Sequence, residues 1–107
     1  MNGIPQITVA ELKQQIDAGQ GPVLIDVREP NEYQIANLGG RLIPMNTVPA
    51  RLDEIPRDRP VVVHCKAGSR SQMVCDFLAN YGYTNIANLS GGILAWSREI
   101  DPAVPQY

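Results

Sequence analysis

The sequence predicts an α/β domain built on a mainly parallel sheet. Two short, nearly continuous apolar runs, 23–27 and 61–64, suit strands that are covered on both faces. Segments with helical spacing lie between such runs, and strands that alternate with helices favour a parallel sheet. The length of 107 residues is that of one domain.

The first predicted helix covers residues 9–18. Thr8 and Glu11 form a capping box, because their side chains can accept hydrogen bonds from amides that the start of a helix leaves free. Gly19 is expected to end this helix. The residues expected to face the core are Val9, Leu12 and Ile16. The pattern then predicts a strand over 23–27, a short helix over 32–36, a short strand or extended segment over 42–44 and a short helix over 49–55.

The rest of the chain continues this alternation. Residues 61–64 form the clearest strand, because they begin with a run of β-branched valines. The spacing of apolar residues then predicts a helix over 71–81, with Gly82 as its C-cap. The helical face is formed by Met73, Val74, Phe77, Leu78 and Tyr81. A strand follows over 85–89, and Gly91 and Gly92 open a last helix.

Composition and charge argue against several classes of function. A formal net charge of -2 disfavours nucleic acid or an anionic membrane as a partner. No apolar stretch approaches the roughly 18 residues that span a bilayer, and the first residues lack the pattern of a signal peptide, so we expect a cytoplasmic protein. Two cysteines and one histidine are too few for a structural zinc site, which takes about four ligands. A disulfide scaffold is not expected either.

Cys65 lies where the strand 61–64 ends and a loop leads into the next helix. Ligands of parallel sheets bind beyond the carboxyl ends of the strands. The backbone N–H groups of this loop can converge on one point, where the helix N-terminus adds partial positive charge and favours a thiolate. The loop residues after the cysteine are Lys66, Ala67, Gly68, Ser69 and Arg70, and Ser71 follows them.

A cysteine at the end of a strand is commonly no more than a small buried apolar residue. The context of Cys65 favours function. A basic residue follows it directly, Gly68 can adopt backbone angles that other residues resist, and Arg70 closes the loop before a helix. We therefore predict that Cys65 is reactive.

Three segments, in this order along the chain, resemble the motifs of rhodanese-family sulfurtransferases. They are 24–29 with Glu32 and Tyr33, then 61–71, then 88–93 with Ala95 and Trp96. The end of the chain, 96–107, is similar to the end of the rhodanese domain fused behind MoeB/ThiF-like adenylyltransferases, the MoeZ type. The resemblance implies one rhodanese-like domain over 1–107, with a mainly parallel, five-stranded sheet flanked by helices on both faces.

The resemblance also implies sulfur transfer without a metal or an organic cofactor. The Cys65 thiolate would take sulfur from a donor such as thiosulfate and pass it from a persulfide to a thiophilic acceptor. The loop amides from Lys66 to Ser71 would stabilise the anionic species, while Lys66 and Arg70 would supply positive charge. The MoeZ-type ending implies a sulfur-carrier protein of the ThiS or MoaD kind as the acceptor, and a fused or associated adenylyltransferase domain.

Two other functions remain as alternatives. Cysteine phosphatases and arsenate reductases use a similar cradle, but the His-Cys-x5-Arg phosphatases have one residue more in the loop than separates Cys65 from Arg70. The shorter loop should close around a smaller centre than phosphate. A non-catalytic binding module of the same fold is the second alternative, and the presence of Cys65 argues against it.

The supporting residues permit more than one interpretation. Either Asp26 orders the neighbouring loops and Arg28 faces the site, or they are structural, with an ion pair such as Arg28 with Glu32. Packing is the main expectation for three further residues: His64, Cys75 and Trp96. Many family members carry His-Ile-Pro-Gly-Ala where this chain has 37–41, so the turn should be looser here, and one interpretation points Arg41 toward the pocket.

Overall fold

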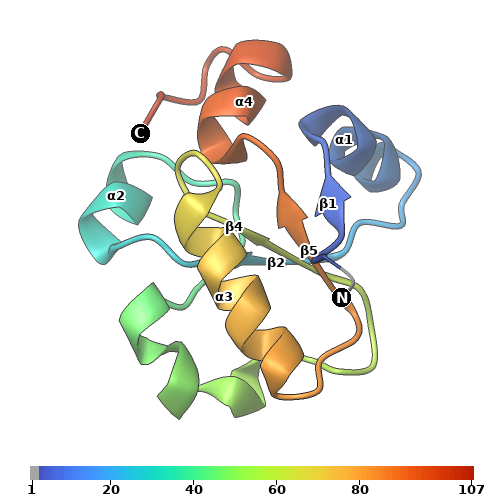
Figure 1. Cartoon of the computed structure of the whole chain (residues 1–107). Helices are drawn as coiled ribbons and strands as arrows, with labels where there is room; N and C mark the ends of the chain where they lie inside the picture. The colour runs from blue at the N-terminus through green and yellow to red at the C-terminus, as the bar shows by residue number, and fades with distance from the viewer. Residues whose placement is uncertain (1–2) are drawn as a thin grey trace.

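The computed structural model of the chain describes residues 3–107, and a parallel sheet lies at its centre (Figure 1). The strands are β1 (Gln6–Ile7), β2 (Val23–Asp26), β3 (Arg41–Leu42), β4 (Val61–His64) and β5 (Ile86–Leu89), and their order across the sheet is β1-β5-β4-β2-β3. The helices are α1 (Val9–Asp17), α2 (Pro30–Ile35), α3 (Ser69–Asn80) and α4 (Gly92–Glu99), with 3₁₀ segments η1 (Met45–Ala50) and η2 (Leu52–Glu54).

The central position of β4 follows from its sequence. All four of its residues are buried, and it pairs in parallel with β2 on one side and β5 on the other. Side chains alternate between the faces of a strand. Accordingly, Val61 and Val63 belong to one core cluster and Val62 to another.

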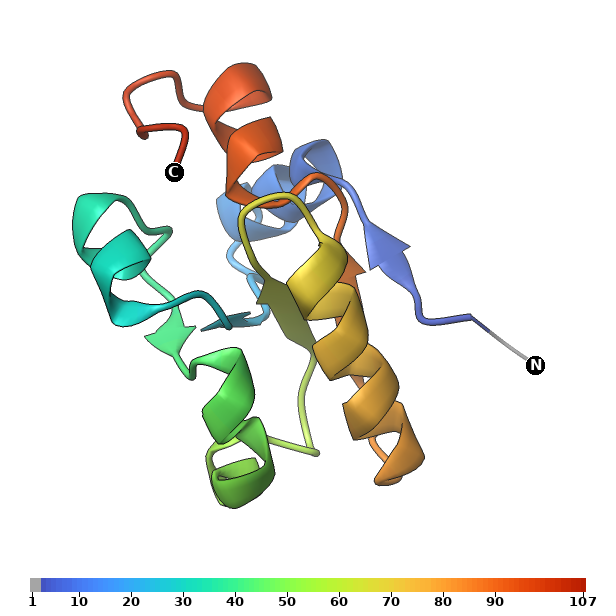
Figure 2. The same cartoon turned by 60° about the vertical axis from the view of Figure 1, so that its left-hand side comes forward.

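Each face of the sheet is covered by its own group of helices. The core cluster around Val61 and Val63 packs against α3 and the 3₁₀ segments, whereas the cluster around Val62 packs against α1 and α4. The turned view shows α3 and α1 on opposite sides of the sheet (Figure 2). The predicted architecture, a five-stranded sheet flanked by helices on both faces, is confirmed, and all the strand pairs are parallel.

Several details differ from the expectations. The two-residue strand β1 was not predicted, because it is too short to show an alternating pattern. The segment predicted as a helix over 49–55 forms two 3₁₀ turns, with Pro49 inside the first. Ile16 was expected in the core, but 41% of its surface is exposed, because it lies in the last turn of α1 beside a surface groove.

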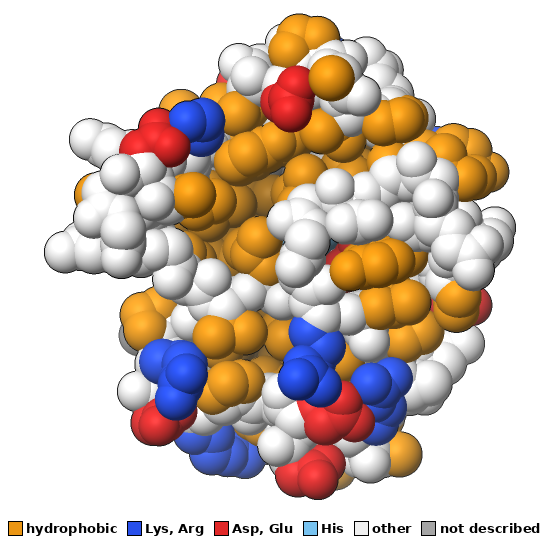
Figure 3. All heavy atoms as spheres, turned by 180° about the vertical axis from the view of Figure 1, so that it is seen from behind, with side chains coloured by type: hydrophobic (Ala, Val, Ile, Leu, Met, Phe, Trp, Pro, Cys, Tyr) orange, Lys and Arg blue, Asp and Glu red, His pale blue; other side chains and the backbone are white. Residues whose placement is uncertain are grey.

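That groove lies on the face covered by α1 and α4, where the two helices leave part of the sheet open. It has a volume of about 220 Å³, and its apolar lining includes Ile16, Leu24, Leu38 and Trp96. Seen from behind, apolar side chains gather in a hollow of the surface (Figure 3). Trp96, which was expected in the core, is therefore only half-buried. No helix within residues 3–107 is both long enough and apolar enough to span a bilayer.

Candidate active site

Cys65 directly follows β4, at the carboxyl edge of the sheet, and only 1% of its surface is exposed. The loop that begins there turns sharply at Gly68, whose φ of 118° lies in the region that other residues avoid. This turn brings the Gly68 N–H within 3.1 Å of the Cys65 sulfur and starts α3 at the next residue. The Gly68 amide thus lies where the predicted cradle requires a donor.

The environment of the Cys65 sulfur favours the thiolate. Burial alone would raise the pKa of this thiol. Hydrogen bonds from the Ser71 hydroxyl and N–H and from the Gly68 and Ala67 amides outweigh burial, so the pKa of Cys65 lies below its usual value. The Ser71 oxygen lies 3.4 Å from the sulfur. These donors are neutral, and the sulfur is therefore stabilised without a direct ion pair.

The N-terminus of α4 determines which way the loop amides point. The Ile93 N–H donates to the Cys65 carbonyl at 3.0 Å, and the Leu94 N–H donates to the Lys66 carbonyl at 3.1 Å. With these carbonyls turned toward α4, the following N–H groups are free to face the sulfur. Figure 2 shows the loop between β4 and α3 reaching the start of α4. A Cβ at Gly92 would lie 2.5 Å from both carbonyl oxygens, so this close approach requires glycine.

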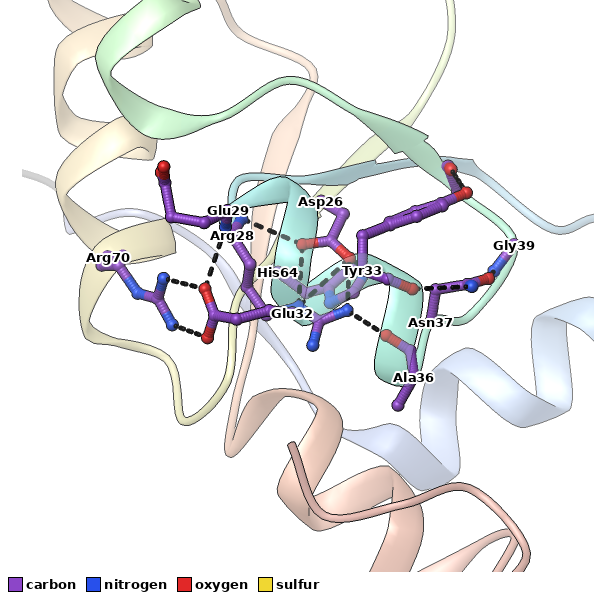
Figure 4. Close-up of polar contacts among 11 residues, drawn as sticks. Asp26, Arg28, Glu29, Glu32, Tyr33, Ala36, Asn37, Gly39, His64 and Arg70 are labelled. Carbon is purple, nitrogen blue, oxygen red and sulfur yellow. Dashed lines mark hydrogen bonds and ion pairs between the residues drawn. The ribbon is translucent and has the colours of Figure 1, made fainter.

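Arg70 forms an ion pair with Glu32 of α2 (Figure 4). Its two terminal nitrogens donate to the two carboxylate oxygens at 2.7 and 2.9 Å. The hydrogen bond from Arg70, supported by the Glu29 N–H and by nearby positive charge, lowers the pKa of Glu32 to about 2 although burial opposes this. The guanidinium of Arg70 was expected to be available for an oxyanion, but it instead joins the loop to α2. A catalytic role for this arginine stays a prediction.

Asp26 and Arg28 form a fully buried ion pair with each other. The Arg28 side chain makes three hydrogen bonds to the Asp26 carboxylate, the shortest at 2.8 Å, and its Nη2 also donates to the Ala36 carbonyl at 2.6 Å. Of the two interpretations, the geometry matches a structural ion pair. The partner of Arg28 in this pair is Asp26 and not Glu32. The pair connects β2 to the end of α2, the helix that carries Glu32.

The side chains of three further loop residues lie at the surface. Lys66, Ala67 and Ser69 are exposed. The Lys66 ammonium lies 5.4 Å from the centre of the Tyr107 ring, which allows a cation–π contact. The side chain of Lys66 is thus directed to Tyr107, while Ala67 contributes its N–H to the Cys65 sulfur.

His64 and Cys75 are both buried, as expected for packing residues. Burial, together with the charge of Arg28, lowers the pKa of His64, although Asp26 lies 3.9 Å away and opposes this. Burial, and secondarily the charges of Asp76 and Cys65, raises the pKa of Cys75 to about 12, so it stays a thiol at neutral pH.

The turn over 37–41 contains several side-chain hydrogen bonds. Asn37 bonds the Tyr33 carbonyl and the Gly39 N–H, and the Tyr33 hydroxyl donates to the Gly40 carbonyl at 2.7 Å. The expected looseness of this turn stays a prediction. Arg41 pairs with Glu54 at 3.1 Å, so its side chain is directed to that carboxylate. Among residues 3–107, no cluster of three or more His, Cys, Asp and Glu side chains is arranged to hold a metal ion.

Two residues at the site were not predicted to belong to it. Asn88 of β5 is buried and accepts a hydrogen bond from the Ser71 hydroxyl. Gly92 was predicted only to open a helix, whereas it makes the closest approach to the Cys65 loop. The sequence did contain one indication that Asn88 has a special role, because it is a polar residue within an otherwise apolar strand. No local pattern indicates a contact between segments so far apart in the sequence.

Comparison with known proteins identifies the family to which this arrangement corresponds. The family model described as rhodanese-like domain matches residues 8–99. A sulfurtransferase of Allochromatium vinosum is 37% identical over 94% of this chain and 95% of its own length. The probable adenylyltransferase/sulfurtransferase MoeZ of Mycobacterium tuberculosis is 36% identical over 94% of this chain, which spans 26% of that longer protein. A thiosulfate sulfurtransferase structure from Pseudomonas aeruginosa superposes with a TM-score of 0.79 and is 29% identical, over 89% of this chain and 19% of that one.

Proposed function

Because the chain belongs to the rhodanese-like family, we propose that it is a sulfurtransferase that moves sulfane sulfur from a donor such as thiosulfate to a thiophilic acceptor through a persulfide on Cys65. The strongest support is the environment of the Cys65 sulfur. It lies in a cradle of hydrogen-bond donors that lowers its pKa, although it is almost wholly buried. A thiolate is the nucleophilic form of cysteine.

The first half-reaction is an attack of the Cys65 thiolate on the outer sulfur of thiosulfate. The sulfur–sulfur bond of thiosulfate breaks, and its electron pair leaves with sulfite. A bond forms between Cys65 Sγ and the transferred sulfur, which carries the negative charge. The Gly68 N–H, which lies 3.1 Å from the sulfur before the reaction, can stabilise anions in the same cradle without rearrangement.

The second half-reaction returns the enzyme to its starting state. A thiophilic acceptor attacks the outer sulfur of the persulfide, and the electron pair of the broken bond returns to Cys65 Sγ. Lys66 lies exposed beside the cradle and is suited to attract an anionic donor or acceptor. Arg70, paired with Glu32, holds the end of the loop against α2.

We extend the proposal to partners by analogy with the relatives. MoeZ is named an adenylyltransferase/sulfurtransferase, and this chain matches about a quarter of it. A ThiS- or MoaD-like sulfur-carrier protein is therefore the proposed acceptor, and a fused or associated adenylyltransferase domain is the proposed neighbour. A cytoplasmic location, and the assignment of all 107 residues to one domain, remain predictions from the sequence.

The test is to incubate the protein with thiosulfate and to measure the mass of the intact protein by mass spectrometry. We expect a mass gain of one sulfur atom that a thiol reductant removes. Cys65→Ala should abolish the gain, whereas Cys75→Ala, which removes the buried thiol of high pKa, should keep it. Absence of any gain with thiosulfate or other sulfane-sulfur donors would favour a binding module. Hydrolysis of an aryl phosphate without sulfur uptake would favour a phosphatase.

A further inference from the structure

The Ser71 hydroxyl lies among three hydrogen-bond acceptors. They are Cys65 Sγ at 3.4 Å, the Gly68 carbonyl at 3.2 Å and the side-chain carbonyl of Asn88, which is the shortest of the three contacts. A hydroxyl has only one proton to donate, so these acceptors compete for it. Ser71 is fully buried and Asn88 is 4% exposed, so bulk water is not an alternative partner.

The orientation of the Asn88 amide is fixed by its other contacts. Asn88 pairs with Val63 of β4 and with Gln6 of β1, which places its side chain on the α3 face of the sheet. Its NH₂ group donates to Gln6 Oε1 at 3.0 Å, to Gln72 Oε1 at 3.3 Å and to the Gly68 carbonyl at 3.4 Å. Because the NH₂ group is held by these acceptors, the carbonyl oxygen faces Ser71.

We propose that Asn88 is a positioning residue for sulfur transfer, because its side-chain carbonyl competes with Cys65 Sγ for the single proton of the Ser71 hydroxyl. This inference rests on the proposed role of Cys65 as the nucleophile. Asn88 has no hydrogen bond to the sulfur, so its side-chain carbonyl acts through Ser71.

The acceptor that receives the Ser71 proton changes during the reaction cycle. While Cys65 is a thiol, the Ser71 hydroxyl donates its proton to the Asn88 carbonyl, which is the shorter contact. The serine oxygen can then accept a hydrogen bond from the thiol. When Cys65 ionises, the hydroxyl turns to the sulfur, and the Asn88 carbonyl loses its donor. In the persulfide the charge lies on the outer sulfur, so Sγ is a weaker acceptor and the proton returns to Asn88. Asn88 therefore opposes ionisation of the resting thiol while it holds Ser71 beside the sulfur.

The decisive measurement is the pH dependence of Cys65 alkylation by iodoacetamide, followed at that residue by mass spectrometry. Asn88→Ala should lower the pKa of Cys65 by about 0.5 to 1 unit, since it removes one competing hydrogen bond of the thiol state. Ser71→Ala alone should raise this pKa, because the thiolate loses a donor. In the Ser71→Ala background, Asn88→Ala should cause no further shift.

Equal shifts in both backgrounds would overturn the proposal, since they would show that Asn88 acts without Ser71. A rise or no change in the single Asn88→Ala variant would also overturn it. Asn88→Val, which suits a strand and also lacks the carbonyl, repeats the test should the alanine variant fold poorly. Ser90→Ala is the matched control and should not shift the pKa, because Ser90 bonds Gln6 in the same cluster but does not contact Ser71. Alkylation needs no sulfur donor, so the outcome is independent of whether the protein takes up sulfur from thiosulfate.

Discussion

At the level of single residues, neutral donors face the sulfur, and charged pairs hold the elements around it. The cradle around Cys65 is made of neutral donors, while the ion pair of Arg70 with Glu32 joins the loop to α2. Behind it, the buried pair of Asp26 and Arg28 fixes the end of that helix through the Ala36 carbonyl. The position of the loop end thus depends on Glu32.

We predict that Glu32→Gln destabilises the fold by about 1 to 2 kcal/mol at neutral pH, because a partly buried, two-pronged ion pair is lost. The pKa of Glu32 is lowered from 4.5 to about 2 in the fold, so its contribution is fully present above pH 4.5 and disappears as the pH falls toward 2. Urea unfolding at a series of pH values should therefore show wild type and variant converging in acid.

Glu54→Gln is the control for this prediction. Glu54 also has a pKa lowered to about 2, mainly by the hydrogen bond from Arg51, but its hydrogen bonds join it to Arg51 and Arg41 and not to the Cys65 loop. Its loss should leave sulfur uptake unchanged, whereas Glu32→Gln should slow it. A stability difference between wild type and Glu32→Gln that stays constant from neutral pH to pH 2 would contradict the ion-pair explanation.

The sequence predicted which residues gather at this site better than it predicted their partners. Cys65, Gly68 and Ser71 were predictable, because a strand end, a glycine and a helix start occur within one short segment. The partners of Arg28 and Arg70 were not, since Arg28 has three acidic residues within four positions and the partner of Arg70, Glu32, lies 38 positions away. Only the geometry of the fold selects among them.

At the level of elements, the site requires contact between the β4–α3 loop and the start of α4. Two amides of α4 hold the carbonyls of Cys65 and Lys66, and this contact leaves no space for a side chain at Gly92. The long elements were predictable from periodicity, whereas no periodic pattern in the sequence indicates this contact between a loop and the start of a helix. The short strand β1 was missed for the same reason.

Gly92→Ala should therefore disrupt the site more than the fold. A Cβ would lie 2.5 Å from two backbone oxygens, and the φ of 57° is itself unfavourable for alanine. We expect a loss of about 1 to 3 kcal/mol in stability. A displacement of the loop amides should reduce the rate of persulfide formation by about 100-fold. Stopped reactions with thiosulfate, analysed by mass, measure this rate.

Gly3→Ala is the matched control for Gly92→Ala, because a Cβ at Gly3 would meet no atom within 4 Å. This variant should have the stability and the rate of the wild type. Normal persulfide formation by folded Gly92→Ala would show that the contact with α4 does not position the loop.

At the level of the whole molecule, the two core clusters lie on opposite faces of one sheet and share β4. Val62 faces α1 and α4, while its neighbours in the strand face α3. Cys65 follows this shared strand, so the nucleophile is attached to the part of the fold that both clusters support. Loss of either cluster should therefore release the strand that carries the site.

We predict that the chain unfolds in one cooperative transition. Substitutions on either face of the sheet should shift the midpoint of this transition in the same way. Leu12 of α1 and Leu78 of α3 are both fully buried, in different clusters, and changing either to alanine should cost about 2 to 5 kcal/mol. Trp96, the only tryptophan, reports on the α1 and α4 face by fluorescence, while circular dichroism reports on all helices. The two urea transitions should coincide in the wild type and in both variants. If Leu78→Ala lowered the dichroism midpoint while the Trp96 midpoint stayed in place, the two faces would be separate folding units and β4 would not couple them.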